Sequence, residues 1–94
     1  MITSFRSKET ELVWSGLVSR RLPRQIQDAA LRKMRLINGA KMLDDLRLPP
    51  GNRLEILRGD RAGEYLIRTN QQWRICFNWD NGEAINVEIC DYHS

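Results

Sequence analysis

The chain of 94 residues is 41% hydrophobic and 29% charged, a composition that excludes a disordered or fibrous protein. Its length suits a single domain with one core, spanning residues 1–94. No apolar run exceeds three residues and the start lacks a signal-peptide pattern, so we expect no membrane span and a cytoplasmic location.

The net charge of +3 is unevenly distributed. Residues 1–47 hold ten basic and five acidic residues, a balance of +5, whereas residues 48–94 hold five basic and seven acidic residues, a balance of −2. The first half suits an acidic partner or RNA phosphates, and a plain solvated face is the alternative. All five basic residues of the second half are arginines, which predicts directed contacts because a planar guanidinium binds a phosphate through two donors.

Two helices are predicted in the first half, after a short strand over residues 1–6. Ser7 is a suitable N-cap for an amphipathic helix whose apolar set reaches Leu17. Pro23 suits the first position of a second helix, which carries apolar residues at helical spacing until Gly39 ends it.

The second half predicts four short strands separated by turn signals, over residues 53–58, 64–69, 73–79 and 84–91. The predicted fold class is therefore α+β, with an N-terminal strand and two helices packed on a twisted antiparallel β-sheet.

Alternation of apolar residues predicts the register of these strands. Pairing apolar with apolar places Ile75 opposite Ile89 and Phe77 opposite Val87, and leaves a three-residue loop over 81–83. In the preceding hairpin the same rule places Ile67 opposite Ile75. These odd-numbered residues should face the helices.

The opposite face then holds Arg68 directly opposite Arg74, with Cys90 beside Arg74 and Tyr92 diagonal to it. Two like charges across a strand pair are unfavourable, and an anionic ligand would remove the penalty. Counter-charge from Glu64 or Glu88, on the same face by parity, is the alternative explanation.

Strict alternation also places the side chains of Asp91 and His93 on the face of the sheet that is toward the helices. For them to meet the two arginines, the last strand must end or twist near Asp91.

We interpret Cys76 and Cys90 as reduced packing residues, since they have neither C-x-x-C spacing nor the density of a disulfide scaffold. One histidine and scattered carboxylates predict no metal site, and no cofactor is expected.

Several motifs follow one another in the second half of the chain: Pro49-Pro50-Gly51-Asn52-Arg53-Leu54, Leu57-Arg58-Gly59-Asp60-Arg61-Ala62-Gly63, Ile67-Arg68, Gln72-Trp73-Arg74-Ile75 and Asp91-Tyr92-His93. Together they resemble the HigB toxins, a branch of the RelE/ParE superfamily. Order and spacing agree from about Arg53 to the end, and the N-terminal part agrees in layout only.

The resemblance implies a RelE-like fold and a toxin of a type II toxin-antitoxin system that cuts messenger RNA in the ribosome. It also implies a partner antitoxin with a helix-turn-helix DNA-binding fold (HigA-like). The toxin would contact operator DNA only through this antitoxin. Several relatives have a histidine where this chain has Glu55. Cleavage is therefore expected to be slow or conditional.

Carried over by resemblance, the catalytic residues are His93, Asp91, Tyr92 and Arg74, and the substrate-binding residues are Arg58, Arg68 and Glu55. His93, with an ordinary pKa near ~6.5, suits proton transfer in an attack by the ribose 2′-hydroxyl, with Asp91 or Glu55 orienting it or acting as the base. Without the motif, a histidine this near the C-terminus would be read as exposed and inert.

The remaining roles concern the phosphates and bases. Arg74 and Arg68 would stabilise the charged transition state, Arg58 would hold a neighbouring phosphate, and Tyr92 would stack on a base or bond the phosphate. A sheet-packing tyrosine is the alternative for Tyr92. Two alternative functions remain open: a non-enzymatic toxin of the ParE branch that inhibits DNA gyrase, and an RNA-binding module that does not cut.

Overall fold

The computed structural model describes residues 1–49 and 51–91. The helical half contains α1 (Lys8–Trp14), α2 (Arg24–Gly39) and the 3₁₀ turn η1 (Leu43–Arg47). The second half contains β1 (Glu55–Ile56), the 3₁₀ turn η2 (Gly59–Arg61), β2 (Glu64–Arg68), β3 (Trp73–Asp80) and β4 (Glu83–Asp91). The strands form one antiparallel sheet in the order β1-β2-β3-β4.

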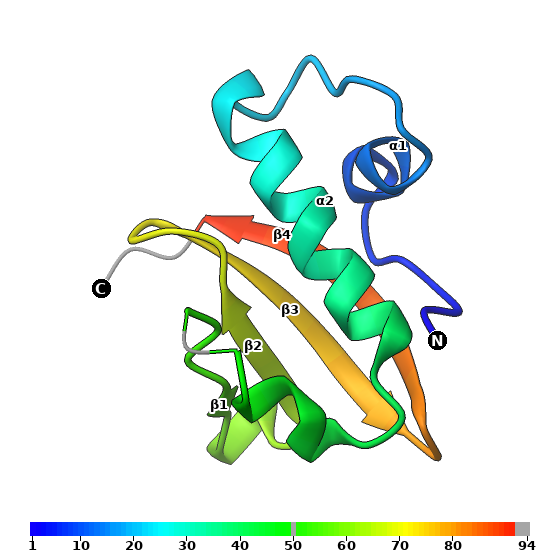
Figure 1. Cartoon of the computed structure of the whole chain (residues 1–94), viewed down its shortest axis with the longest axis vertical. Coiled ribbons are helices and arrows are strands. Elements are labelled where there is room, and N and C mark those ends of the chain that lie inside the picture. Colours follow the sequence, from blue (N-terminus) through cyan, green and yellow to red (C-terminus); the bar gives the residue numbers. More distant parts are fainter. Residues whose placement is uncertain (50, 92–94) are drawn as a thin grey trace.

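The two helices lie on one face of this twisted sheet, with α2 crossing β3 and β4 and α1 beside it (Figure 1). The predicted α+β class and layering are confirmed. Fully buried side chains of α2, such as Ala30, Met34 and Ile37, share a core with odd-numbered strand residues such as Ile75 and Phe77. Burial of this stripe drives the packing of α2 on the sheet. None of the described helices has the length and hydropathy that a membrane span requires.

The first helix is shorter than predicted. It begins at its expected cap, where Ser7 accepts from the Thr10 N–H, but it ends at Trp14. Gly16 has a φ of 84°, and the Leu17 N–H donates to the Leu12 carbonyl across the helix end. Because the helix ends at this glycine, Leu17 points away from the core, and its side chain is 59% exposed.

The predicted first strand is present only as two isolated parallel bridges beside β4, Ile2 with Ala84 and Phe5 with Val87. A regular ladder does not form because β4 bulges at Asn86, whose φ is 55°. The Asn86 N–H donates to the Ser4 hydroxyl instead. Further along, the Ile89 N–H donates to the hydroxyl of the buried Thr10.

The sheet register agrees with the prediction at the arginines and departs from it at one turn. Ile67 pairs with Ile75, Arg68 with Arg74, and Arg74 with Cys90. The predicted three-residue loop is wrong, because a two-residue turn at Asn81-Gly82, both with positive φ, joins β3 to β4. The bulge compensates for this shorter turn, so Phe77 and Val87 lie at the bulge rather than directly paired.

The cysteines form a disulfide between β3 and β4, which corrects the prediction of two reduced residues. Cys76 pairs in register with Glu88 and Cys90 with Arg74, so the cysteines occupy diagonal positions on one face. Their Cα atoms are 6.5 Å apart, within the range that a disulfide spans. Spacing along the chain could not reveal this, because the proximity arises from strand pairing.

Glu64, at the start of β2, joins the N-terminal segment to η2. Its carboxylate accepts from Arg6 Nη1 at 3.0 Å and from Arg61 Nε at 2.8 Å. The Arg61 hydrogen bond is the largest cause that lowers the pKa of Glu64; burial opposes the shift and Arg6 adds to it. The Glu64 side chain is only 12% exposed, so its carboxylate is largely shielded from solvent in this ion pair.

Reducing the disulfide should lower the free energy of unfolding by about 3 kcal/mol, the chain-entropy value for a closed loop of ~15 residues. Denaturant unfolding with and without reductant measures this difference. Cys90→Ser, which cannot form the bridge, should match the reduced protein in both conditions. Equal stability of the oxidised and reduced proteins would contradict the expectation.

Glu64→Gln should destabilise the protein at pH 7, with the difference from wild type shrinking below about pH 4. A carboxylate whose pKa is lowered by folding stabilises the native state above its unfolded-state pKa, and that contribution disappears as pH falls through the lowered value. Thermal unfolding across this range tests the sign. Glu83→Gln, at an exposed carboxylate, is the matched control, and a pH-independent loss in Glu64→Gln would contradict the assignment.

Candidate functional site

Three arginines and a glutamine surround one hollow of about 520 Å³ at the end of the sheet where β2 turns into β3. The lining residues are Arg53, Arg68, Gln71 and Arg74, and we call this place the arginine hollow. Arg68 is the last residue of β2, Arg74 the second of β3, and Gln71 lies in the turn between them. Arg53 comes from the loop that precedes β1.

The turn between β2 and β3 holds the Arg74 guanidinium in place. Asn70 begins an Asx turn, since its side-chain oxygen accepts from the Gln72 and Trp73 N–H groups at 2.9 and 2.8 Å. Arg74 Nη1 donates to the carbonyl of Asn70, and to those of Gln71 and Trp73 at 3.1 and 3.2 Å. The half-buried Arg74 is therefore oriented by the backbone before any ligand binds.

Arg53 and Arg68 meet because the loop before β1 is hydrogen-bonded to the end of β2. The Arg68 N–H donates to the Asn52 carbonyl at 2.6 Å. Arg53 follows with a φ of 46°, in the left-handed region that residues other than glycine seldom adopt. This conformation, held by the fixed residue before it, directs the exposed Arg53 to the hollow.

The alternative in which Glu64 or Glu88 supplies the counter-charge is not seen at Arg53 or Arg68 in the described part of the chain. Glu64 bonds Arg6 and Arg61 at the other end of β2. Among residues 1–49 and 51–91, no carboxylate forms an ion pair with Arg53 or Arg68. Arg53 and Arg68, two like charges that form no ion pair within that part of the chain, favour a ligand with phosphate or carboxylate groups. In the same part of the chain, no three metal-ligating side chains gather.

Asp91 lies at the edge of this region. It is the last residue of β4, pairs in register with Trp73 and is exposed. The strand therefore continues through Asp91, so alternation places this residue on the face of Trp73 rather than that of Arg74. Gln72 Nε2 donates to its carboxylate at 3.1 Å, which ties Asp91 to the turn that carries the hollow. Tyr92 and His93 lie outside the described residues.

The two remaining predicted site residues do not line the hollow. Arg58 is exposed and precedes η2, close to the start of β2, whereas Arg68 ends that strand. The first and last residues of β2, Glu64 and Arg68, are four residues apart in an extended chain, a separation of about 13 Å. Glu55 is exposed in β1 and pairs with Leu66, two residues before Arg68.

Arg53 is the residue that the predicted site lacked. Its place opposite Arg68 follows from continuing the Glu55–Leu66 pairing by two residues, and that pairing is known only from the structure. Gln71 was also absent from the predicted site, and only the geometry of its turn brings it to the hollow.

Comparison with known proteins places the chain in a family. The model of the HigB-like toxins, RelE-like toxins of type II toxin-antitoxin systems, matches residues 4–93. Toxin HigB-1 of Vibrio cholerae is 39% identical over 90 residues, which span 95% of each chain. Endoribonuclease HigB of Proteus vulgaris is 32% identical over 93 residues, which span 99% of this chain and 100% of that relative.

Among solved structures, the YoeB dimer from Staphylococcus aureus has a similar fold, with a TM-score of 0.57 over 99% of this chain and 95% of that one. At 18% sequence identity this likeness concerns the fold alone, and it supports the predicted RelE-like arrangement. Because the family model spans nearly the whole chain and both named relatives exceed 30% identity, the chain belongs to the HigB-like toxins of type II toxin-antitoxin systems.

Proposed function

We propose that this toxin is an endoribonuclease that cuts messenger RNA on the ribosome, with the scissile phosphate bound in the arginine hollow. The observation that carries the proposal is the convergence of Arg53, Arg68 and Arg74 on one hollow. Guanidinium groups held at fixed positions stabilise the charge that builds on a phosphate during cleavage. The printed name of the Proteus vulgaris relative, Endoribonuclease HigB, supports the same reaction.

In the proposed reaction the ribose 2′-hydroxyl attacks the adjacent phosphorus, and the bond to the leaving 5′-oxygen breaks. The products are a 2′,3′-cyclic phosphate and a 5′-hydroxyl, so no metal-bound water is required. His93 moves the proton, with Asp91 or Glu55 orienting it or acting as the base. Tyr92 stacks on a base or bonds the phosphate, and Arg58 holds a neighbouring phosphate along the strand.

Glu55 gives this toxin a specific disadvantage in that reaction. Glu55 is a carboxylate, exposed in β1, at a position where the resemblance to the HigB toxins implies a histidine. It lies within two residues of Arg53 along the chain, so it adds negative charge near the hollow. We infer slower cleavage than in a relative with histidine at this position.

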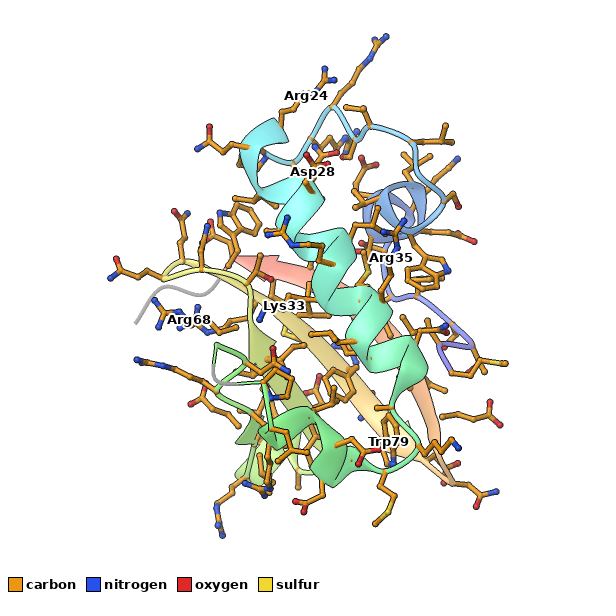
Figure 2. The ribbon with its side chains drawn as sticks, in the orientation of Figure 1. Arg24, Asp28, Lys33, Arg35, Arg68 and Trp79 are labelled. Carbon is orange, nitrogen blue, oxygen red and sulfur yellow. A yellow bond between two sulfur atoms is a disulfide. The ribbon has the colours of Figure 1, made fainter. Side chains whose placement is uncertain are left out.

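The partners follow from the family and from the charge. A type II toxin has an antitoxin partner, and we propose that it is a HigA-like helix-turn-helix protein through which the complex meets operator DNA. The exposed cations of α2, such as Arg24, Arg32 and Arg35, are candidates for contacts with ribosomal RNA. We propose that the toxin acts there, in the cytoplasm. Figure 2 shows Arg24 at one end of α2 and Arg35 further along it.

Arg68→Ala and Arg74→Ala should each lower the cleavage rate about 10²–10³-fold, the cost of one well-placed donor to a developing oxyanion. Growth arrest on induction should disappear with both variants. Arg47→Ala is the matched control, because this exposed arginine pairs with Asp44, does not line the hollow and should leave toxicity unchanged. Full toxicity of both hollow variants, with normal thermal unfolding, would reject the proposal.

Mapping transcript 5′ ends after brief induction tests the ribosome dependence. We expect new 5′ ends in frame within translated regions, and their loss when translation initiation is blocked. Intact transcripts together with inhibited supercoiling by gyrase would instead establish the ParE-like alternative. RNA binding without new 5′ ends would establish a module that does not cut.

A further inference from the structure

One lysine of α2 is joined to the loop that carries Arg53. Lys33 Nζ donates to Asn52 Oδ1 at 2.6 Å. The loop passes close to the ammonium group, since a Cβ at Gly51 would lie 3.6 Å from Nζ. Figure 2 shows Lys33 on the side of α2 toward Arg68. The lysine therefore connects the helix layer to the edge of the sheet beside the arginine hollow.

Asn52, the residue that Lys33 bonds, is fully buried and forms four hydrogen bonds, one of them from its N–H to the Pro49 carbonyl at 3.0 Å. Its Nδ2 donates to the Leu46 carbonyl at 3.1 Å, and its own carbonyl accepts from the Arg68 N–H. Asn52 thus joins α2, η1 and the end of β2 at one point. Arg53 is the next residue, in its left-handed conformation, so the position of Asn52 determines where the Arg53 side chain starts.

A lysine at this position is unfavourable for packing alone. Partial burial is the larger cause that lowers its pKa, and the neighbouring charge of Arg32 adds to the shift. An aliphatic side chain of similar length would fill the space without the free-energy cost of desolvating a charged group. The ammonium is explained if its hydrogen bond to Asn52 has a function of its own.

We propose that Lys33 is a positioning residue that acts through Asn52 to hold Arg53 in the arginine hollow, where Arg53 binds an RNA phosphate. The inference rests on the proposed function for the identity of the ligand. Lys33 itself does not line the hollow, which is formed by Arg53, Arg68, Gln71 and Arg74. Its contribution to binding should therefore depend entirely on the presence of the Arg53 guanidinium.

A double-mutant cycle of Lys33→Met and Arg53→Gln tests this dependence. The probe is a short fluorescent 2′-O-methyl RNA, which the protein cannot cut because the attacking hydroxyl is blocked. Each single variant should weaken binding about tenfold, the size of one lost hydrogen bond to a charged group. The double variant should be no weaker than Arg53→Gln alone, whereas independent contacts would multiply to about a hundredfold.

The salt dependence of binding separates positioning from a general structural effect. Each single variant should reduce the slope of log affinity against log salt by about 0.7, and the double variant by the same amount, because one phosphate contact is lost in all three. Lys41→Met, at an exposed lysine beyond α2, should bind as the wild type does. If thermal unfolding shows that Lys33→Met does not fold, Lys33→Gln takes its place in the cycle.

The outcomes distinguish the inference from the function on which it rests. Wild-type binding by Lys33→Met, or multiplicative effects in the cycle, would overturn the positioning role. A wild type that binds the probe and shows the predicted cycle but never cuts messenger RNA would support the positioning role and reject the nuclease. A wild type that does not bind the probe would overturn the positioning role, whereas the nuclease is judged by the transcript 5′ ends.

Discussion

The pairing of Ile67 with Ile75 beneath α2 determines the position of nearly every other functional group in the molecule. Both side chains are fully buried, and a slip of one residue would exchange the buried and outer faces of β2 and β3. The core therefore forces Arg68 and Arg74 to lie opposite each other, although two neighbouring cations oppose that arrangement. Burial of apolar area, a much larger effect, prevails over the repulsion.

Much of the fold and part of the site could be predicted, because both depend on alternation and helical spacing. The paired arginines, Cys90 beside Arg74 and the core face all follow from period-two patterns. The failures have other causes. Gly16 ends α1 through local backbone geometry, and the Asn81-Gly82 turn is compensated by a bulge at Asn86. No pattern of hydrophobicity reports either event. The disulfide and Arg53 required knowledge of pairing across strands.

Net charge is a poor guide to where cationic side chains gather on this protein. The second half of the chain is negative in sum, yet it supplies all three arginines of the hollow. Its carboxylate Glu64 is occupied by Arg6 and Arg61 at the far end of β2. Local placement, rather than the sum, thus sets the potential that an approaching phosphate would meet.

The N-terminal segment, residues 1–6, runs beside β4 and affects how the protein behaves in concentrated solution. An uncovered outer strand exposes a row of unsatisfied amides and carbonyls, on which a second molecule can extend the sheet. Here Thr3 and Arg6 donate to carbonyls of β4, and Ser4 and Thr10 accept from its N–H groups. At the other margin, β1 is only two residues long. Both margins are therefore poor templates for intermolecular strand addition.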